Sequence, residues 1–320
     1  MCNGTIMDKL ISFSIPLMLS GILQLMFNAV DIVVVGRFSG SQALAAVGST
    51  TALINVFTNL FIGISLGANV LAARYYAAGK TKEMSETVHT AIALALVSGV
   101  AMAVIGVVFA RGALEIMGTP DDVIAKSTLY MRIYFCGMPF FMMYNYGAAI
   151  LRAVGDTKRP LIFLIVSGVI NAVLNLFLVI GFHLDVAGVG IATVISQLVS
   201  CILVLRCLHH TESSYQLHLA KLRIRSVYLK QIFEVGVPAG IQSTVINISN
   251  AMLQSSVNSF GSIAMAGYTA SNNIFGFLYV SVNSFTQACM SFTSQNYGVK
   301  KLKRMDRVLI DCMILSVVVT

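Results

Sequence analysis

Charged side chains are scarce in this sequence. Only 11% of its 320 residues are Asp, Glu, Lys or Arg, whereas 57% are hydrophobic and the mean hydropathy is +0.83. This balance excludes a soluble globular domain, which typically carries about twice that share of charge. The apolar runs recur along the whole chain, and several are long enough to span a bilayer. The sequence therefore predicts an all-α polytopic membrane protein.

Residue groupings that carry catalysis or bind transition metals are also missing. None of the six cysteines forms a Cys-x-x-Cys pair, so neither disulfides nor a cysteine metal site is expected. Gly63-Ile64-Ser65-Leu66-Gly67 matches the G-x-S-x-G pattern of hydrolases, but Ser65 lies within an apolar run and not on a strand–turn–helix. The five histidines lie in loops or at the ends of apolar runs. We therefore expect no enzyme and no cofactor, and we interpret the two glycines as sites of close helix packing.

Basic residues are distributed unevenly between the loops. We predict membrane-spanning helices at about 12–35, 44–73, 86–110, 122–147, 160–182, 187–208, 231–257, 264–293 and from 307 onward. The loops after the second, fourth, sixth and eighth helices are rich in Lys and Arg, whereas those after the first, third and fifth hold only Arg37 and Arg111. The positive-inside rule then predicts a multi-pass protein of the cell inner (plasma) membrane with a cytoplasmic N-terminus. The net charge of +8 reflects this orientation, and no nucleic-acid partner is expected.

A polar and basic stretch at 209–230 separates the first six predicted helices from the rest. We interpret 1–208 as an N-terminal lobe of six transmembrane helices and 209–230 as a cytoplasmic linker. The remaining residues, 231–320, are interpreted as an incomplete C-terminal lobe of about two and a half transmembrane helices. We expect a fragment that lacks the last helices of the second lobe.

An internal repeat supports this division. Ile15-Pro16 opens the first helix, and Val237-Pro238 lies near the start of the seventh. Both copies begin on the same side of the membrane, which makes the repeat a parallel one. Parallel repeats around a central cavity are typical of transporters.

One acidic residue is isolated within the first apolar run. Asp31 is the only charged residue in 15–35, and a charge at membrane depth costs about 2.5–3.5 kcal/mol on insertion scales. Gln24, Asn28 and Asp31 follow the spacing i, i+4, i+7 and therefore share one helix face. This stripe predicts one wall of a polar site inside a helical bundle. The alternative is a single carboxylate that reaches the lipid headgroups, since Arg37 follows closely.

Other polar residues are predicted at the same depth. Asn171 and Asn175 lie one turn apart on the fifth helix, and Thr193 lies on the sixth. Together with Asp31 they offer a carboxylate, two amide oxygens and a hydroxyl, which can hold Na⁺ or leave Asp31 to carry a proton. A proton needs only Asp31, so we favour proton coupling. Hydrogen bonding between helices explains any single Asn, and the case for a cation-coupling site rests on the combination.

A second set of amide residues is expected to line a central cavity. Its members are Gln24, Asn28, Asn55, Asn145, Gln197, Asn247, Asn250 and Gln254. Met138 and Met142 are candidates for an adaptable apolar part of the same cavity, with ordinary packing as the alternative.

The sequence resembles the MATE (multidrug and toxic compound extrusion) family along essentially its whole length. The most specific marks are Asp31 and the loop Arg152-Ala153-Val154-Gly155-Asp156-Thr157. Further matches are Ile15-Pro16, Ala72-Ala73-Arg74-Tyr75-Tyr76, Asn171-x3-Asn175 and the run from Ala187 to Thr193.

This resemblance implies twelve helices in two six-helix lobes, arranged as a V around a cavity, and cation-coupled export. It also implies that Asp31, Asn171 and Thr193 belong to the first-lobe coupling site, whereas the position of Asn175 is an Asp in some relatives. Members of the NorM type carry a carboxylate on the seventh helix, which this chain lacks. The chain therefore resembles the DinF-type branch.

The function expected from these inferences is secondary antiport, in which amphipathic or cationic small molecules leave in exchange for H⁺ or Na⁺. We expect a monomer surrounded by membrane lipid. The alternative in the same superfamily is a flippase for a lipid-linked precursor, which should carry several basic residues facing its cavity. Arg132 is the only basic residue well inside a predicted helix, which disfavours that alternative.

Overall fold

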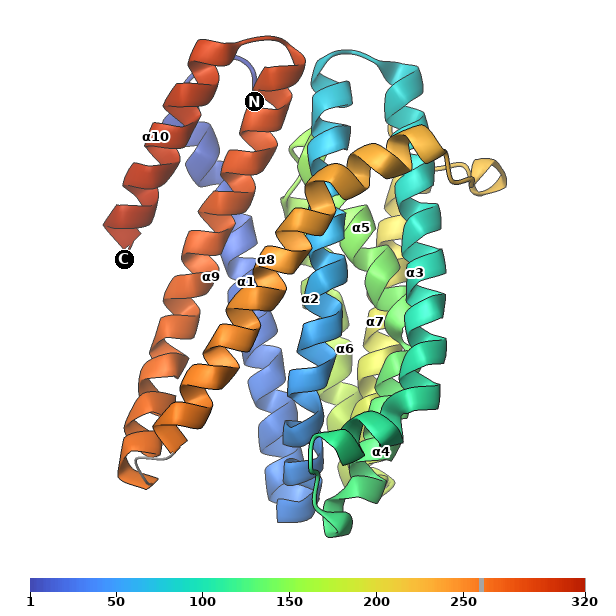
Figure 1. The fold of residues 1–320 in the computed structure, drawn as a ribbon. Helices are drawn as coiled ribbons and strands as arrows, with labels where there is room; N and C mark the ends of the chain where they lie inside the picture. Colours follow the sequence, from blue (N-terminus) through green and yellow to red (C-terminus); the bar gives the residue numbers. More distant parts are fainter. Residues whose placement is uncertain (259–261, 320) are drawn as a thin grey trace.

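The computed structural model describes residues 1–258 and 262–319, and these form an all-α fold (Figure 1). The structure describes only the backbone at 52, 251, 254, 255, 258, 262–266, 269, 270, 273 and 274. The helices are α1 (Ile6–Phe38), α2 (Ser41–Ala77), α3 (Thr81–Ile116), α4 (Asp121–Cys136), α5 (Met138–Val154), α6 (Lys158–Leu176), α7 (Asp185–His209), α8 (Ser226–Asn258), α9 (Ser262–Gly298) and α10 (Leu302–Val319). A short π-helix, η1 (Phe177–Gly181), continues α6, and a 3₁₀ turn, η2 (Leu219–Lys221), lies in the linker.

The prediction of one continuous helix at 122–147 is wrong. The structure divides this segment at Gly137 into α4 and α5, and α5 continues to Val154. Pro139 lies in the first turn of α5, where it has no N–H to donate and its ring would clash with the carbonyl of the preceding turn. Gly137 is buried against Gln197 and Val194 of α7, so the break has no room for a Cβ.

Within the described residues, five helical segments are long and apolar enough to cross a membrane. They are α1, α2, α3, α7 and the continuous segment Lys158–Gly181. With 16 and 17 residues, α4 and α5 cover the bilayer thickness only when taken together. These segments identify a multi-pass membrane protein.

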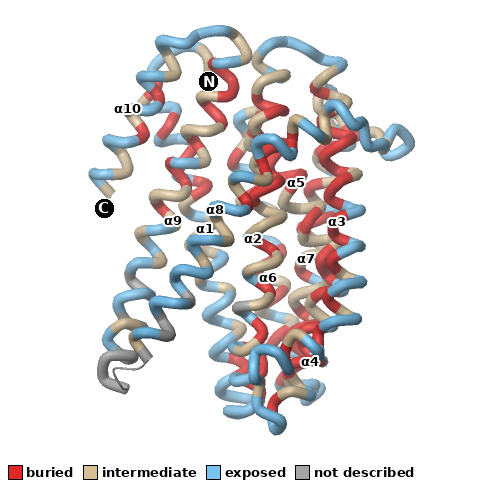
Figure 2. The backbone as a smooth tube through the Cα atoms, in the orientation of Figure 1, coloured by how far each residue is buried: buried red, intermediate tan, exposed pale blue. Residues whose placement is uncertain are grey.

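The helices form a bundle of α1–α7, against which α8–α10 pack at one side (Figure 1). In this view α8 crosses α2 diagonally, and α8 and α9 approach the bundle near the end that carries the N-terminus. Toward the other end they diverge from it. Residues of α8 and α9 become less buried toward that end (Figure 2). Ile232 of α8 and Phe292 of α9 are buried, whereas Met252 of α8 and Phe275 of α9 are exposed.

Four glycines let α2 and α8 approach backbone to backbone. A Cβ on Gly63 would overlap the main chain of Gly240, and a Cβ on Gly67 would overlap Ile232 O and lie 2.9 Å from the nitrogen of Gly236. The predicted packing role of the Gly63–Gly67 run is therefore confirmed. Between these glycines, the Ser65 hydroxyl donates to the carbonyl of Ile62 in its own helix, at 2.6 Å.

The segment between α7 and α8 is fastened to the start of α3. The Glu86 carboxylate forms ion pairs with Arg223 and with Arg225, the latter at 3.2 Å. The backbone N–H of His218 donates to Nε2 of His89, at 3.1 Å. These bonds hold the segment against the α1–α7 bundle.

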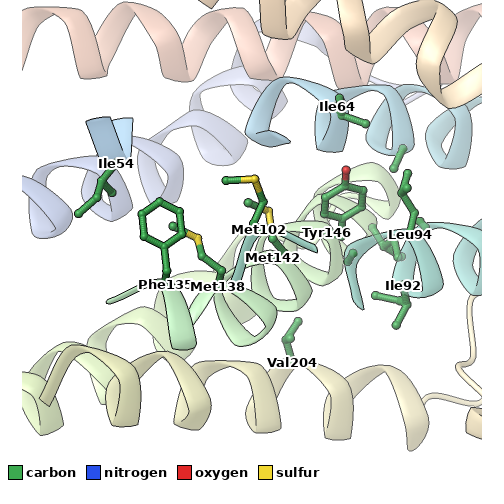
Figure 3. Close-up of a cluster of buried hydrophobic side chains, with 14 of the residues drawn as sticks. Ile54, Ile64, Ile92, Leu94, Met102, Phe135, Met138, Met142, Tyr146 and Val204 are labelled. Atoms are coloured by element: carbon green, nitrogen blue, oxygen red, sulfur yellow. The ribbon is translucent and has the colours of Figure 1, made fainter. Parts of the chain in front are cut away.

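Met138 and Met142 belong to the packed core of the α1–α7 bundle. Both are fully buried, in one cluster with Met102, Phe135 and Tyr146 (Figure 3). Ordinary packing, the alternative to a cavity role, therefore accounts for both methionines.

Candidate cation site in the α1–α7 bundle

Close packing between α1 and α6 brings their polar faces together. Phe27 of α1 fits against Gly168 of α6, where a Cβ would overlap the phenyl ring. Asp31 lies one turn beyond Phe27, and Asn171 and Asn175 lie one and two turns beyond Gly168. The small residue in α6 therefore sets the helix separation at which the Asp31 side chain reaches Asn175.

A chain of hydrogen bonds connects the four residues predicted to form the cation site. Nδ2 of Asn175 donates to Oδ1 of Asp31 and also to Oδ1 of Asn171, the second bond at 3.2 Å. Nδ2 of Asn171 donates to the Thr193 hydroxyl at 3.5 Å, and that hydroxyl donates to the carbonyl of Val189 at 2.9 Å. Three helices, α1, α6 and α7, thus contribute to one polar cluster. Its role in coupling stays a prediction.

The cluster is rich in acceptors that lack donors. Asn175 is fully buried, and its Oδ1 has no hydrogen-bond partner among the described residues. Gln197 of α7 is only partly buried, but its Oε1 atom is also buried without a partner among the described residues. An unsatisfied buried polar atom costs about 1–3 kcal/mol, so such atoms point to a missing donor or cation.

Asp31 points into the bundle and has no cationic partner. Of the ion pairs formed by the described residues, none involves Asp31, and its hydrogen bond to Asn175 reaches across to α6. The alternative of a carboxylate that reaches the headgroups near Arg37 does not describe this geometry.

Two tyrosines of α4 complete the surroundings of Asp31. Tyr130 and Tyr134 lie within electrostatic range of the Asp31 carboxylate, and the Tyr134 side chain lies beside Gln197. Their ring centroids are 6.2 Å apart. Sequence reasoning misses both residues, although their spacing of four on one helix face is a signal that could have identified them.

The amide residues proposed to line a cavity have mixed surroundings. Gln197 alone adjoins the polar cluster through α7 and α4. Asn145 and Asn247 each donate to a carbonyl of their own helix at 2.8 Å, which is ordinary intrahelical bonding. The exposed members are Gln24, Asn28, Asn55 and Asn250. The Gln254 side chain lies outside the described residues.

The donor set suits a hard cation or a proton. Within the described chain, no three His, Cys, Asp or Glu side chains gather as a transition-metal site. One carboxylate with neutral amide and hydroxyl oxygens is instead the kind of ligand set that alkali and alkaline-earth cations accept. The same carboxylate, with an amide beside it, can also take up and release a proton.

Comparison with known proteins places these features in context. The sequence profile of the MatE family matches residues 16–177 and 238–320. The probable multidrug resistance protein YoeA of Bacillus subtilis (strain 168) is 33% identical over 304 residues, which cover 93% of this chain and 66% of YoeA. A second protein of that strain, the probable multidrug resistance protein YpnP, is 25% identical over 304 residues, which cover 94% of this chain and 67% of YpnP.

A solved structure has the same fold. An outward-facing multidrug resistance MATE family transporter of the MOP superfamily matches with a TM-score of 0.91 and 21% identity, over 99% of this chain and 70% of that one. The chain thus spans about two thirds of the length of the curated relatives that it matches.

Proposed function

Because this chain belongs to the MATE family of multidrug efflux transporters, we propose that it works as a secondary antiporter exporting amphipathic or cationic small molecules. The family relationship makes it a transporter and not an enzyme. The chain covers about two thirds of YoeA, so the proposed activity is that of the whole protein. The ion that drives export binds at the polar cluster around Asp31.

The observation that carries this proposal is the pairing of Asp31 with Asn175. The ionised carboxylate accepts a hydrogen bond from Nδ2 of Asn175. A protonated Asp31 becomes a donor, and Oδ1 of the same Asn175 amide is a buried acceptor that has no donor among the described residues. Each protonation state therefore has an amide partner within the cluster. This arrangement favours H⁺ over Na⁺ as the coupling ion.

Transport by the full-length protein tests the proposal. In proteoliposomes loaded with a panel of cationic dyes, we expect an imposed pH gradient to drive dye movement. A Na⁺ gradient at equal pH should have little effect. If dye movement follows the Na⁺ gradient and ignores the pH gradient, the cluster is a Na⁺ site; if neither gradient moves any dye, the antiport proposal is wrong.

Asn175→Asp is expected to change the ion dependence of transport. It places a second carboxylate beside Asp31, and two close carboxylates resist simultaneous ionisation and attract cations more strongly. We expect a shifted pH profile of dye efflux or a new dependence on Na⁺. Gln42→Glu, which also turns an amide into a carboxylate but at an exposed position in the first turn of α2, is the matched control and should leave the ion dependence of efflux unchanged. The same profile in wild type and Asn175→Asp would remove Asn175 from the site.

The flippase alternative finds no support in the surroundings of Arg132. This residue lies in α4, and its Nε donates to the carbonyl of Val107 in α3 at 3.1 Å. It therefore bonds to a neighbouring helix within the α1–α7 bundle.

We propose that the N-terminus and the segment between α7 and α8 face the cytoplasm of the cell inner (plasma) membrane. The Lys and Arg bias of the loops supports this orientation. In a full-length protein without native cysteines, a cysteine at exposed Ser213 should resist an impermeant thiol reagent added to intact cells. A cysteine at exposed Asp122, in the first turn of α4, should react. The reverse result would invert the orientation.

A further inference from the structure

The loop between α5 and α6, one of the two most specific sequence marks of the chain, forms one wall of a cavity. This loop cavity has a volume of about 530 Å³, and its walls include Lys9, Phe13, Tyr76, Asp156, Lys158, Tyr215 and Phe292. They come from α1, α2, the α5–α6 loop, the start of α6, the segment after α7, and α9. The volume lies within the range of small-ligand sites.

The α5–α6 loop is a rigid wall. Gly155 adopts φ of 101°, in the left-handed region, and its N–H donates to Arg152 O at 3.0 Å. The next N–H, of Asp156, donates to Leu151 O at 2.9 Å, which completes a glycine-based helix end. Oδ1 of Asp156 then accepts the N–H of Arg159 at 3.1 Å, at the start of α6. The sharp turn brings Lys158 to the cavity wall.

The charge of the cavity is positive. Asp156 is its one acidic lining residue, and this carboxylate is already ion-paired with Arg159 at 3.3 Å. Among the described residues, Lys158 has no carboxylate partner, and Lys9 donates only to the carbonyl of Asn3, at 2.6 Å. Two lysines thus line the cavity, and neither has a carboxylate partner among the described residues. An anion with more than one negative charge, such as a phosphate monoester, would satisfy both.

Aromatic rings form the apolar part of the walls. Tyr76 and Tyr215 pack edge to face with ring centroids 6.2 Å apart, and Phe13 and Phe292 do so at 5.6 Å. Phe13 and Phe292 are buried, whereas Tyr76 and Tyr215 keep exposed ring surface that can contact a planar aromatic group or an acyl chain. The cavity therefore combines an anion-binding side with an apolar side.

We propose that the loop cavity binds a phosphate ester that carries an aromatic or acyl portion. Lys9 and Lys158 bind the phosphate, and the rings of Tyr76 and Tyr215 hold the apolar portion. Phe292 belongs to α9, and most of the other lining residues belong to the α1–α7 bundle, so a ligand in the cavity lies where the two helix groups meet. It stabilises the conformation in which they meet at this end, because it binds that conformation better. The binding itself does not depend on the proposed function. Only an effect of this stabilisation on transport rests on it.

Thermal unfolding of the full-length protein in phosphate-free maltoside detergent tests the binding without any transport. The soluble probe is adenosine 5′-monophosphate, the lipid probe is phosphatidylglycerol, and adenosine is the uncharged control. We expect at least one phosphate probe, and not adenosine, to raise the unfolding temperature. A response to the nucleotide alone identifies a soluble ligand, and a response to the lipid alone identifies a headgroup.

Charge variants establish the place of binding. Lys9→Gln/Lys158→Gln should weaken the apparent affinity at least tenfold. Lys82→Gln/Lys303→Gln, which removes two exposed lysines outside the cavity lining, should leave it unchanged. If the first double variant does not fold, Tyr215→Ala, which removes one ring of the wall, should show the same weakening. Equal weakening in both double variants, or no response to either phosphate probe, overturns the proposal.

Discussion

Asp31→Asn should abolish gradient-driven efflux while the protein still folds and inserts. An Asn at this position keeps a carbonyl oxygen that can accept the hydrogen bond from Nδ2 of Asn175, so the link between α1 and α6 persists. What disappears is the negative charge, and with it any ability to exchange a proton or attract a cation. We expect efflux to fall by at least a hundredfold in proteoliposomes, with an unfolding temperature close to that of the wild type.

The matched control for this variant is Asp8→Asn, on the same helix. Asp8 is exposed and accepts a hydrogen bond from the Thr5 hydroxyl at 2.7 Å. Its replacement should leave efflux unchanged. Undiminished ion-driven efflux by Asp31→Asn would show that the coupling ion binds elsewhere.

Gly63→Ala is the second change with a large expected effect. The added methyl would overlap the Cα and nitrogen of Gly240 in α8, and backbone atoms cannot rotate away. The two helices must then separate, which also loosens the contact of Gly67 with Gly236. Overpacking of this kind costs about 1–3 kcal/mol. We expect a lower unfolding temperature and a loss of efflux of at least tenfold, because α8 joins the second helix group to the first.

Gly48→Ala separates this packing effect from the general effect of replacing glycine in a helix. Gly48 lies in α2 as well, but a Cβ there meets nothing within 4 Å. An exposed helical Gly→Ala change usually stabilises by up to about 1 kcal/mol, so the unfolding temperature should stay constant or rise. If Gly63→Ala behaved like Gly48→Ala, the close approach of α2 and α8 would not matter for stability or transport.

Several features follow from the sequence because they depend on residues that are neighbours along the chain. The hydrophobic composition and the recurring apolar runs decide that the chain forms membrane helices, since each helix satisfies its own backbone hydrogen bonds. Asp31 is identifiable as a functional candidate for the same reason: it interrupts an apolar run, and a charge there is costly unless a neighbouring helix supplies a polar partner. The packing role of Gly63 and Gly67 is also predictable, because two small residues four apart leave one helix face flat.

Other features depend on contacts between helices, and only the tertiary structure decides them. The face of α1 that carries Asp31 is predictable, but its meeting with Asn175 depends on the fit of Phe27 against Gly168. The break between α4 and α5 requires Gly137 to pack against α7 as well as Pro139 to interrupt the backbone bonding. Hydropathy and periodicity are sums over neighbouring residues, so they carry no information about which faces meet. The fully packed Met138 and the shared walls of the loop cavity are likewise products of that three-dimensional fit.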